Sequence, residues 1–333
     1  MEAGALRYVF GPVMSGRLGR SLGLDLLGER VCSMNCVYCE SGPLAHLTLT
    51  RAPYVPAAAI LAELAGWEAG RKERGEPLPD VVSLGGLGEP TLNSEMPEVI
   101  AGVRRILPGV PVAALTNASL MTIPAVRAEL ALADIVLPSL DALEPEAFCC
   151  VNRAHSRLDA RAIADGILAF RREFCGKLYL EVLLVAGVND SEQNLQLLAD
   201  FCRDLRADRV DVVTLSRPGT ELDALPVGAD MLAHWRERLG VRTGELAAQS
   251  ADGLAPGPEK GHIQPGGMPP GEIRSRILAS LSRRPQTAAQ LAAALLTPQD
   301  QVERILAELL AEGSAQRAPQ AGETGFPYFQ ARG

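Results

Sequence analysis

The chain has 333 residues, of which 47% are hydrophobic and 22% are charged, and its formal net charge is −8. This length allows one large domain and one small one, and the composition is that of a globular protein with a sizeable core. The negative net charge excludes a wholly basic surface for binding nucleic acid, but it is compatible with a local basic patch.

The 7 cysteines are an odd number in a long chain, which does not suit a secreted disulfide framework. The first sixteen residues show no basic segment followed by an apolar run, and no stretch approaches the ~18 uninterrupted apolar residues of a membrane helix. We therefore expect a cytoplasmic protein without a membrane partner, in a reducing compartment where thiolates persist as ligands.

Strand and helix patterns alternate along most of the chain. Strands are predicted at 22–27, 80–84, 110–116, 134–140, 178–185 and 209–215, and helices at 56–74, 95–106, 124–132, 158–173, 191–204 and 229–239. Such α/β alternation argues for parallel strands, arranged as a partial (β/α)6 TIM-type barrel or as an open doubly wound sheet. In either arrangement, sites gather at the C-terminal ends of the strands.

The composition changes after this alternation. We predict a barrel domain over 1–243, a Pro/Gly-rich linker over 244–271 and a compact unit over 272–333. In the last unit, three predicted helices, the second capped by Thr287, precede a two-stranded tail, which is typical of a winged helix-turn-helix. Acids outnumber arginine on the third helix, so docking of protein, peptide or RNA fits as well as DNA reading, and so does a structural appendage.

Three cysteines, Cys32, Cys36 and Cys39, follow the first predicted strand at C-x3-C-x2-C spacing. Three thiolates on a four-iron cluster leave one iron free to bind a small molecule through an amine and a carboxylate. Because such clusters usually take four cysteines, a trio in a tight loop is informative. Zinc is the alternative, but it would need a fourth ligand, for which His46 and the distant Cys149 are candidates.

This motif, with an aromatic residue before its third cysteine, resembles the radical S-adenosylmethionine (SAM) superfamily. Segments 11–23, 86–92, 116–117, 139–142 and 181–190 are similar to its wybutosine-synthesis-like branch, with departures at Met14, Gly16 and Ala154. The resemblance implies a [4Fe–4S] cluster on the three cysteines and SAM on the open iron. Reductive cleavage would then give a 5′-deoxyadenosyl radical that abstracts hydrogen from a substrate, with reduced flavodoxin or ferredoxin as electron donor.

The resemblance also implies cofactor contacts. The glycine-rich strand end at 85–89 lets the backbone approach a ligand, and its glutamate suits an ammonium group. Polar residues that end the fourth strand could bond the ribose, and the aromatic residue of the cysteine loop could lie near the adenine. Each also suits an ordinary role as turn residue, cap or cluster shield. The predicted SAM contacts are Tyr38, Gly86, Gly88, Glu89, Asn117, Ser139 and Asp141.

The candidates for substrate contacts are Arg17, Arg153, His155 and Arg217, which we expect at the mouth of the barrel. Arginine forks match phosphate and carboxylate groups, although a solvated arginine is the commoner case. The substrate class stays open between an RNA base, a peptide and a metabolite, with RNA or peptide reaching the C-terminal unit. The alternative is a non-catalytic Fe–S redox sensor that uses the winged helix for DNA or protein binding. The glycine–glutamate motif argues against it, because a pure sensor needs no SAM site.

Overall fold

The computed structural model describes residues 6–217, 219–240, 269–318 and 327–332. The predicted linker at 244–271 falls almost wholly outside these ranges. Within them, no helix has the length and apolar character needed to cross a membrane.

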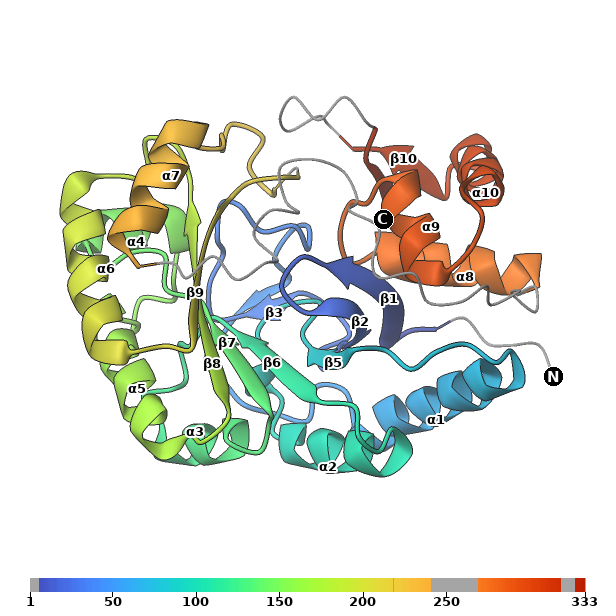
Figure 1. Cartoon of the computed structure of the whole chain (residues 1–333), viewed down its shortest axis with the longest axis horizontal. Coiled ribbons are helices and arrows are strands. Elements are labelled where there is room, and N and C mark those ends of the chain that lie inside the picture. Colours follow the sequence, from blue (N-terminus) through green and yellow to red (C-terminus); the bar gives the residue numbers. More distant parts are fainter. Residues whose placement is uncertain (1–5, 218, 241–268, 319–326, 333) are drawn as a thin grey trace.

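One curled sheet of seven strands organises the larger part of the chain, in the order β1-β2-β5-β6-β7-β8-β9 (Figure 1). Its strands are β1 (Val9–Ser15), β2 (Gly19–Leu24), β5 (Val81–Leu84), β6 (Val112–Thr116), β7 (Ile135–Pro138), β8 (Lys177–Leu184) and β9 (Arg209–Thr214). From β2 to β9 every pairing is parallel, whereas β1 runs antiparallel to β2 at one edge. The sheet is therefore a half-barrel with two separate edges.

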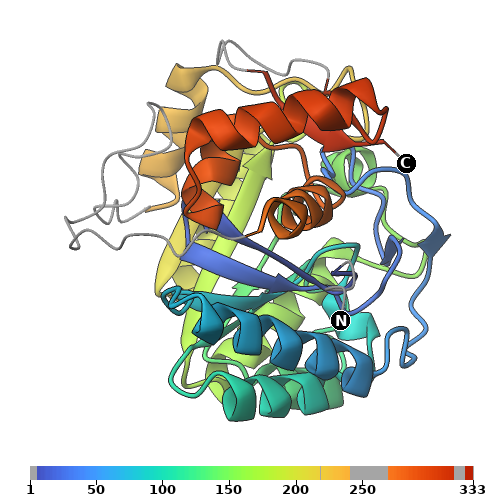
Figure 2. The same ribbon diagram turned by 90° about the vertical axis from the view of Figure 1, so that its right-hand side faces the viewer.

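Helices that connect or follow the parallel strands lie along the outer side of this sheet (Figures 1 and 2). They are α1 (Ala57–Glu73), α2 (Met96–Ile106), α3 (Pro124–Leu130), α4 (Pro145–Asn152), α5 (Ala160–Glu173), α6 (Glu192–Leu205) and α7 (Ala229–Arg238). A doubly wound sheet would carry helices on both faces. The predicted α/β alternation is thus confirmed in its partial-barrel form.

The alternation of side chains along β8 separates the two faces of the sheet. Leu180 and Val182 are fully buried in the main core between sheet and helices. Tyr179 packs instead in a smaller apolar cluster on the concave face, together with Leu18 from the β1–β2 turn. The hairpin turn therefore helps to fill the interior of the barrel.

The hairpin formed by β1 and β2 differs from the prediction. No strand was predicted before 22, because the pairing of β1 with β2 is irregular between Phe10 and Val13 and interrupts the alternation. Two polar residues near the start of β2 also hide its pattern. Ser21 Oγ donates to Ser83 Oγ at 2.9 Å in the barrel interior, whereas Arg20 Nη1 donates to Pro77 O at 3.0 Å. Helix α4, 8 residues long, was not predicted, and it adds a second helix between β7 and β8.

The C-terminal unit contains α8 (Pro270–Leu281), α9 (Ala288–Leu295), α10 (Gln299–Ala311), β10 (Ala315–Arg317) and β11 (Phe329–Ala331). It has an apolar core of its own, which includes Ile277, Leu291 and Leu306. The predicted cap is confirmed, since Thr287 Oγ1 accepts from Gln290 N at 3.2 Å in a capping box.

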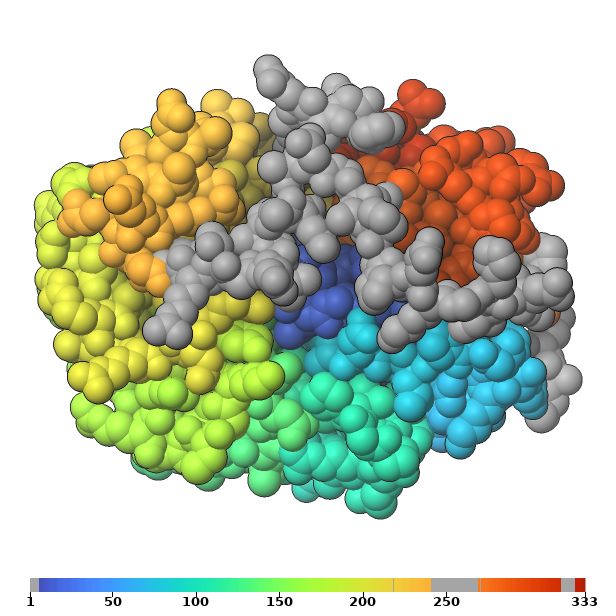
Figure 3. Space-filling model, in the orientation of Figure 1, coloured from blue at the N-terminus to red at the C-terminus, as the bar shows by residue number. Residues whose placement is uncertain are grey.

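Helices α8 and α9 of this unit pack against β1, so the unit covers one edge of the half-barrel (Figures 1 and 2). The space-filling view shows it as one flank of the molecule (Figure 3). An ionic network continues this interface, with Arg74 2.9 Å from Glu272 and Arg276 3.4 Å from Glu76. Arg276 is 2% exposed, so these charges are enclosed between the two units.

We expect Gly23→Ala to destabilise the protein by about 1–3 kcal/mol, because the added methyl group would overpack the space between β2 and the ring of Phe10. Phe10 is the cross-strand partner of Gly23, and a Cβ at Gly23 would lie 2.1 Å from its ring. Gly16→Ala is the matched control in the same hairpin, since a Cβ there meets nothing within 4 Å. Urea unfolding of both variants checks this, and equal stabilities would contradict it.

Candidate functional site

The cysteine loop begins at β3 (Val31–Cys32), which pairs with the short strand β4 (His46–Leu47). The glycine-rich turn after β5 holds β3 from the other side. Val31 N donates to Leu87 O at 3.3 Å, and Glu89 N donates to Val31 O at 3.1 Å. Gly88 has a φ of +115°, and a Cβ there would lie 1.9 Å from Val31 O. This glycine is therefore required for the contact between the two predicted motifs.

The second half of the cysteine loop is held by the end of α4. Asn35 N donates to Asn152 O at 3.0 Å, and Val37 N donates to Val151 O at 3.0 Å. His155 N donates to the loop carbonyl of Ser33 at 2.9 Å. Backbone hydrogen bonds from two distant segments thus fix the stretch that carries the three cysteines.

The three thiols of the loop form no disulfide, and side-chain amides donate hydrogen bonds to two of them. Asn117 Nδ2 donates to Cys32 Sγ, and Asn152 Nδ2 to Cys36 Sγ, both at 3.5 Å. Burial, with the nearby Glu89 carboxylate, raises the pKa of Cys32 to about 12. The pKa of Cys36 is raised as well, first by burial and then by Asp141.

This donor set fits an iron–sulfur cluster, because enclosed thiols beside carboxylates give up their protons only to a strongly cationic partner. Among the described residues, no group of three or more His, Cys, Asp or Glu side chains is arranged to hold a single metal ion. The assignment of the trio to a cluster therefore rests on its chemistry.

Glu89, predicted to contact SAM, is 2% exposed and joins the ends of two strands. Its Oε1 accepts from Thr91 N, Thr91 Oγ1 and Thr116 Oγ1 at 3.1, 2.6 and 2.7 Å, and its Oε2 accepts from Asn117 N at 2.7 Å. Burial raises the pKa of Glu89, and these hydrogen bonds oppose that effect. The carboxylate thus positions Asn117, and only Oε2 retains capacity for a ligand.

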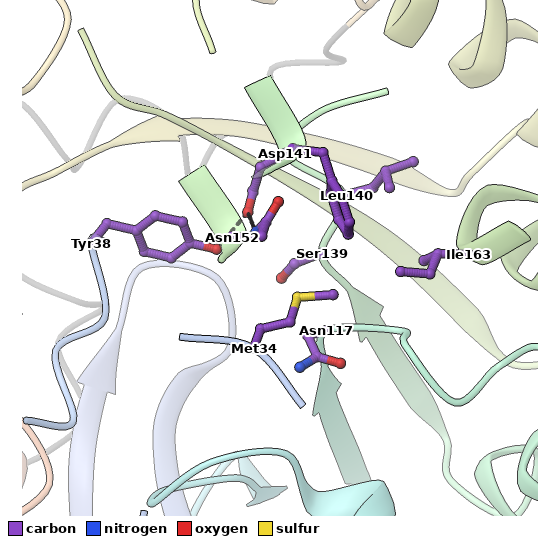
Figure 4. Close-up of a pocket in the computed structure, with 9 residues that line it drawn as sticks. Met34, Tyr38, Asn117, Ser139, Leu140, Asp141, Asn152 and Ile163 are labelled. Atoms are coloured by element: carbon purple, nitrogen blue, oxygen red, sulfur yellow. Dashed lines mark hydrogen bonds between the residues drawn. The ribbon is translucent and has the colours of Figure 1, made fainter. Parts of the chain in front are cut away.

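Asp141 plays a similar part on the other side of the loop (Figure 4). Its Oδ2 accepts from the Tyr38 hydroxyl and, at 2.8 Å, from Asn152 Nδ2, while its Oδ1 accepts from Leu183 N at 2.9 Å. Burial raises the pKa of Asp141. Asn152 is a site residue that the sequence reasoning missed, since only its place beside Arg153 drew attention to it.

A small cavity beside the cysteine loop, about 10 Å³ in volume, brings several predicted contacts together (Figure 4). Four of the predicted SAM contacts line it, namely Tyr38, Asn117, Ser139 and Asp141. Met34 of the cysteine loop, which was not predicted, lies between Ser139 and Asn117 in this view. The ends of β6 and β7 and the loop itself therefore converge on one space.

The predicted substrate contacts separate into two groups. Arg153 and His155 are not among the residues that line the cavity. Arg153 is exposed and pairs with Glu221, and His155 Nδ1 accepts from Arg157 N at 3.3 Å.

Arg17 and Arg217 instead share an electrostatic environment on the concave face. Arg217 pairs with Glu40 at 3.2 Å. Arg17 stands in the β1–β2 turn, at the N-terminal ends of the parallel strands, and its side chain reaches Glu181 from within the barrel.

No family model matches the chain. The chain is 38% identical over 216 residues to a UPF0026 protein of Helicobacter pylori, a match that covers 65% of this chain and 68% of that protein. It is 35% identical over 211 residues to the protein named GTPase Obg of Brachyspira hyodysenteriae. That match covers 63% of this chain but only 30% of the relative, so the chain spans less than a third of that relative's length.

Among solved structures, a radical SAM methyltransferase from Sphaerobacter thermophilus superposes with a TM-score of 0.50. The match covers 66% of this chain and 63% of that chain, with 19% identity. At this level of identity the comparison shows a shared fold.

Gly88→Ala is expected to cost about 1–3 kcal/mol, because a side chain at this φ is strained and would also collide with Val31 O. The strand β3 carries Cys32, so its displacement should lower the iron content of the protein after anaerobic reconstitution. Gly85→Ala is the control, since a Cβ there would lie 3.7 Å from Leu115, an ordinary contact. Thermal unfolding and iron content together check this, and full iron loading of Gly88→Ala would refute it.

Asn152→Leu should destabilise the protein by about 1–3 kcal/mol, because the hydrogen bonds to Asp141 and Cys36 are lost. Asn152→Asp should cost more, because it places a second carboxylate against Asp141 and the thiol. The comparison is made by urea unfolding at neutral pH. If the two variants were equally stable, Asn152 would not act by donating to these acceptors.

Proposed function

The chain belongs to the UPF0026 family, and on that premise we propose that it is a radical SAM oxidoreductase of the wybutosine-synthesis-like branch. The observation that carries the proposal is the convergence on one cavity of the cysteine loop and the polar residues that end β6 and β7. The shared fold with a radical SAM methyltransferase supports it. In this proposal, Cys32, Cys36 and Cys39 hold the [4Fe–4S] cluster.

When bound, the cluster and SAM supply a 5′-deoxyadenosyl radical for hydrogen abstraction from the substrate. The residues of the chain hold and tune this site. The amides of Asn117 and Asn152 direct hydrogen bonds to two of the three sulfurs, an arrangement that sets cluster potentials. The buried carboxylates of Glu89 and Asp141 keep Asn117 and Tyr38 in place.

The substrate in this proposal is an RNA base, a peptide or a metabolite, and the electron donor is a reduced flavodoxin or ferredoxin. We further propose that the C-terminal unit is a winged helix that binds RNA or peptide. A non-catalytic redox sensor is the competing function. It would need no cavity lined by Asn117, Ser139 and Asp141 beside the cysteine loop, and no observation favours it.

Anaerobic reconstitution should give about four iron and four sulfide per chain, and dithionite should then drive conversion of SAM to 5′-deoxyadenosine. Cys32→Ala should lower both iron content and product at least about tenfold, because a cluster ligand is lost. Cys175→Ala is the control, since Cys175 is exposed and lies outside the loop.

The amount of 5′-deoxyadenosine formed is measured by chromatography. A reconstituted wild-type protein that binds four irons but never cleaves SAM would support the sensor and refute the enzyme.

A further inference from the structure

Two arginines of the C-terminal unit reach back to the barrel directly after α8. Arg283 lies 3.2 Å from Asp25 at the end of β2, and its guanidinium stands 5.6 Å from the centre of the Phe10 ring. It also donates to the carbonyl of Arg7. The position of the next residue, Arg284, is thereby fixed against the half-barrel.

The concave face of the sheet carries three ion pairs, which we call the interior charge cluster. They are Arg17–Glu181, Arg209–Asp211 at 2.8 Å and Arg217–Glu40 at 3.2 Å. Their side chains are between 14% and 33% exposed, so solvent screens them only in part. Each arginine of the cluster thus has one carboxylate.

Arg284 adds a fourth guanidinium to this cluster. The charges that act on it most strongly are Arg217, Glu40 and Arg17, so two of the three are cationic. Its Nε is buried and has no hydrogen-bond partner, and no carboxylate of the described residues forms an ion pair with its side chain. Burial and the neighbouring arginines lower the pKa of Arg284 to about 10.

The position of the cluster connects it to the proposed active site. Glu40 directly follows the cysteine Cys39. Glu181 is the bridge partner of Ser139, so the two side chains leave neighbouring strands on the same face, and Ser139 lines the cavity. A ligand held at Arg284 would therefore lie beside the cysteine loop.

We propose that Arg284, supplied by the C-terminal unit, binds an anionic group of the substrate, a carboxylate or a phosphate, with Arg217 as its neighbour. Four guanidiniums face three carboxylates, and one further anion balances the charge. A guanidinium whose Nε is buried without a partner is costly, and its planar fork matches these two oxyanions. The inference rests on the proposed function for the identity of the bound molecule as substrate.

Isothermal titration calorimetry on the reconstituted full-length chain tests this with inorganic phosphate in one arm and acetate in the other. The wild type should bind one of the two saturably, and that arm identifies the anion. Arg284→Gln should weaken this binding at least about tenfold, and Arg284→Lys less, because the charge remains without the fork. Arg304→Gln, at a residue of the same unit with a 72% exposed side chain, is the control and should bind like the wild type.

A second measurement separates binding from structure. Because the Nε of Arg284 is buried without a partner and its side chain forms no ion pair with the described residues, Arg284→Gln should leave the melting temperature unchanged or raise it in the absence of added anion. A lowered melting temperature, no binding of either anion by the wild type, or equal binding by wild type and Arg284→Gln would each overturn the proposal. Failure of the proposed function is a different result, since it appears as the absence of 5′-deoxyadenosine from the wild type.

Discussion

The close approach of two backbones, at Gly88 and Val31, is the constraint on which the site depends. A cysteine loop has few apolar contacts with which to fix its own shape, so its geometry must come from hydrogen bonds to rigid neighbours. The turn after β5 supplies them on one side, and the end of α4 on the other. Only a residue without a side chain permits the first contact, since a Cβ at Gly88 would lie 1.9 Å from a carbonyl oxygen.

Two buried carboxylates hold the parts of the site that these backbone hydrogen bonds do not reach. Glu89 and Asp141 are each 2% exposed and accept four and three hydrogen bonds respectively. Taking such groups out of water is costly unless their oxygens are satisfied. Here the donors come from different strands and loops, so satisfying the carboxylate also aligns the elements. From the sequence alone, Glu89 and Asp141 were predicted only as contacts for SAM.

The sequence predicted the strand–helix alternation and four residues of the cavity lining, because hydrophobic periodicity and strand ends are local properties. It could not predict that Arg17 would enter the barrel from the hairpin turn, since this depends on β1, whose irregular pairing hides its pattern. The amide of Asn152 and the charge of Arg284 were missed for a related reason. Their roles arise from partners 116 residues away in the first case and from the docking of a second unit in the other.

The pairing of Arg283 with Asp25 has a consequence for how this chain can be divided. Asp25 is fully buried, and its Oδ1 accepts from Leu27 N at 3.0 Å and from Leu87 N at 3.4 Å, next to Gly86. Its other oxygen has Arg283 as its counter-charge. A barrel cut free of the C-terminal unit would keep this carboxylate in its interior and lose the cation. The truncated protein would thus have a destabilised end of β2 beside the cysteine loop. Removal of the C-terminal unit would therefore change the structure around the site as well as the length of the chain.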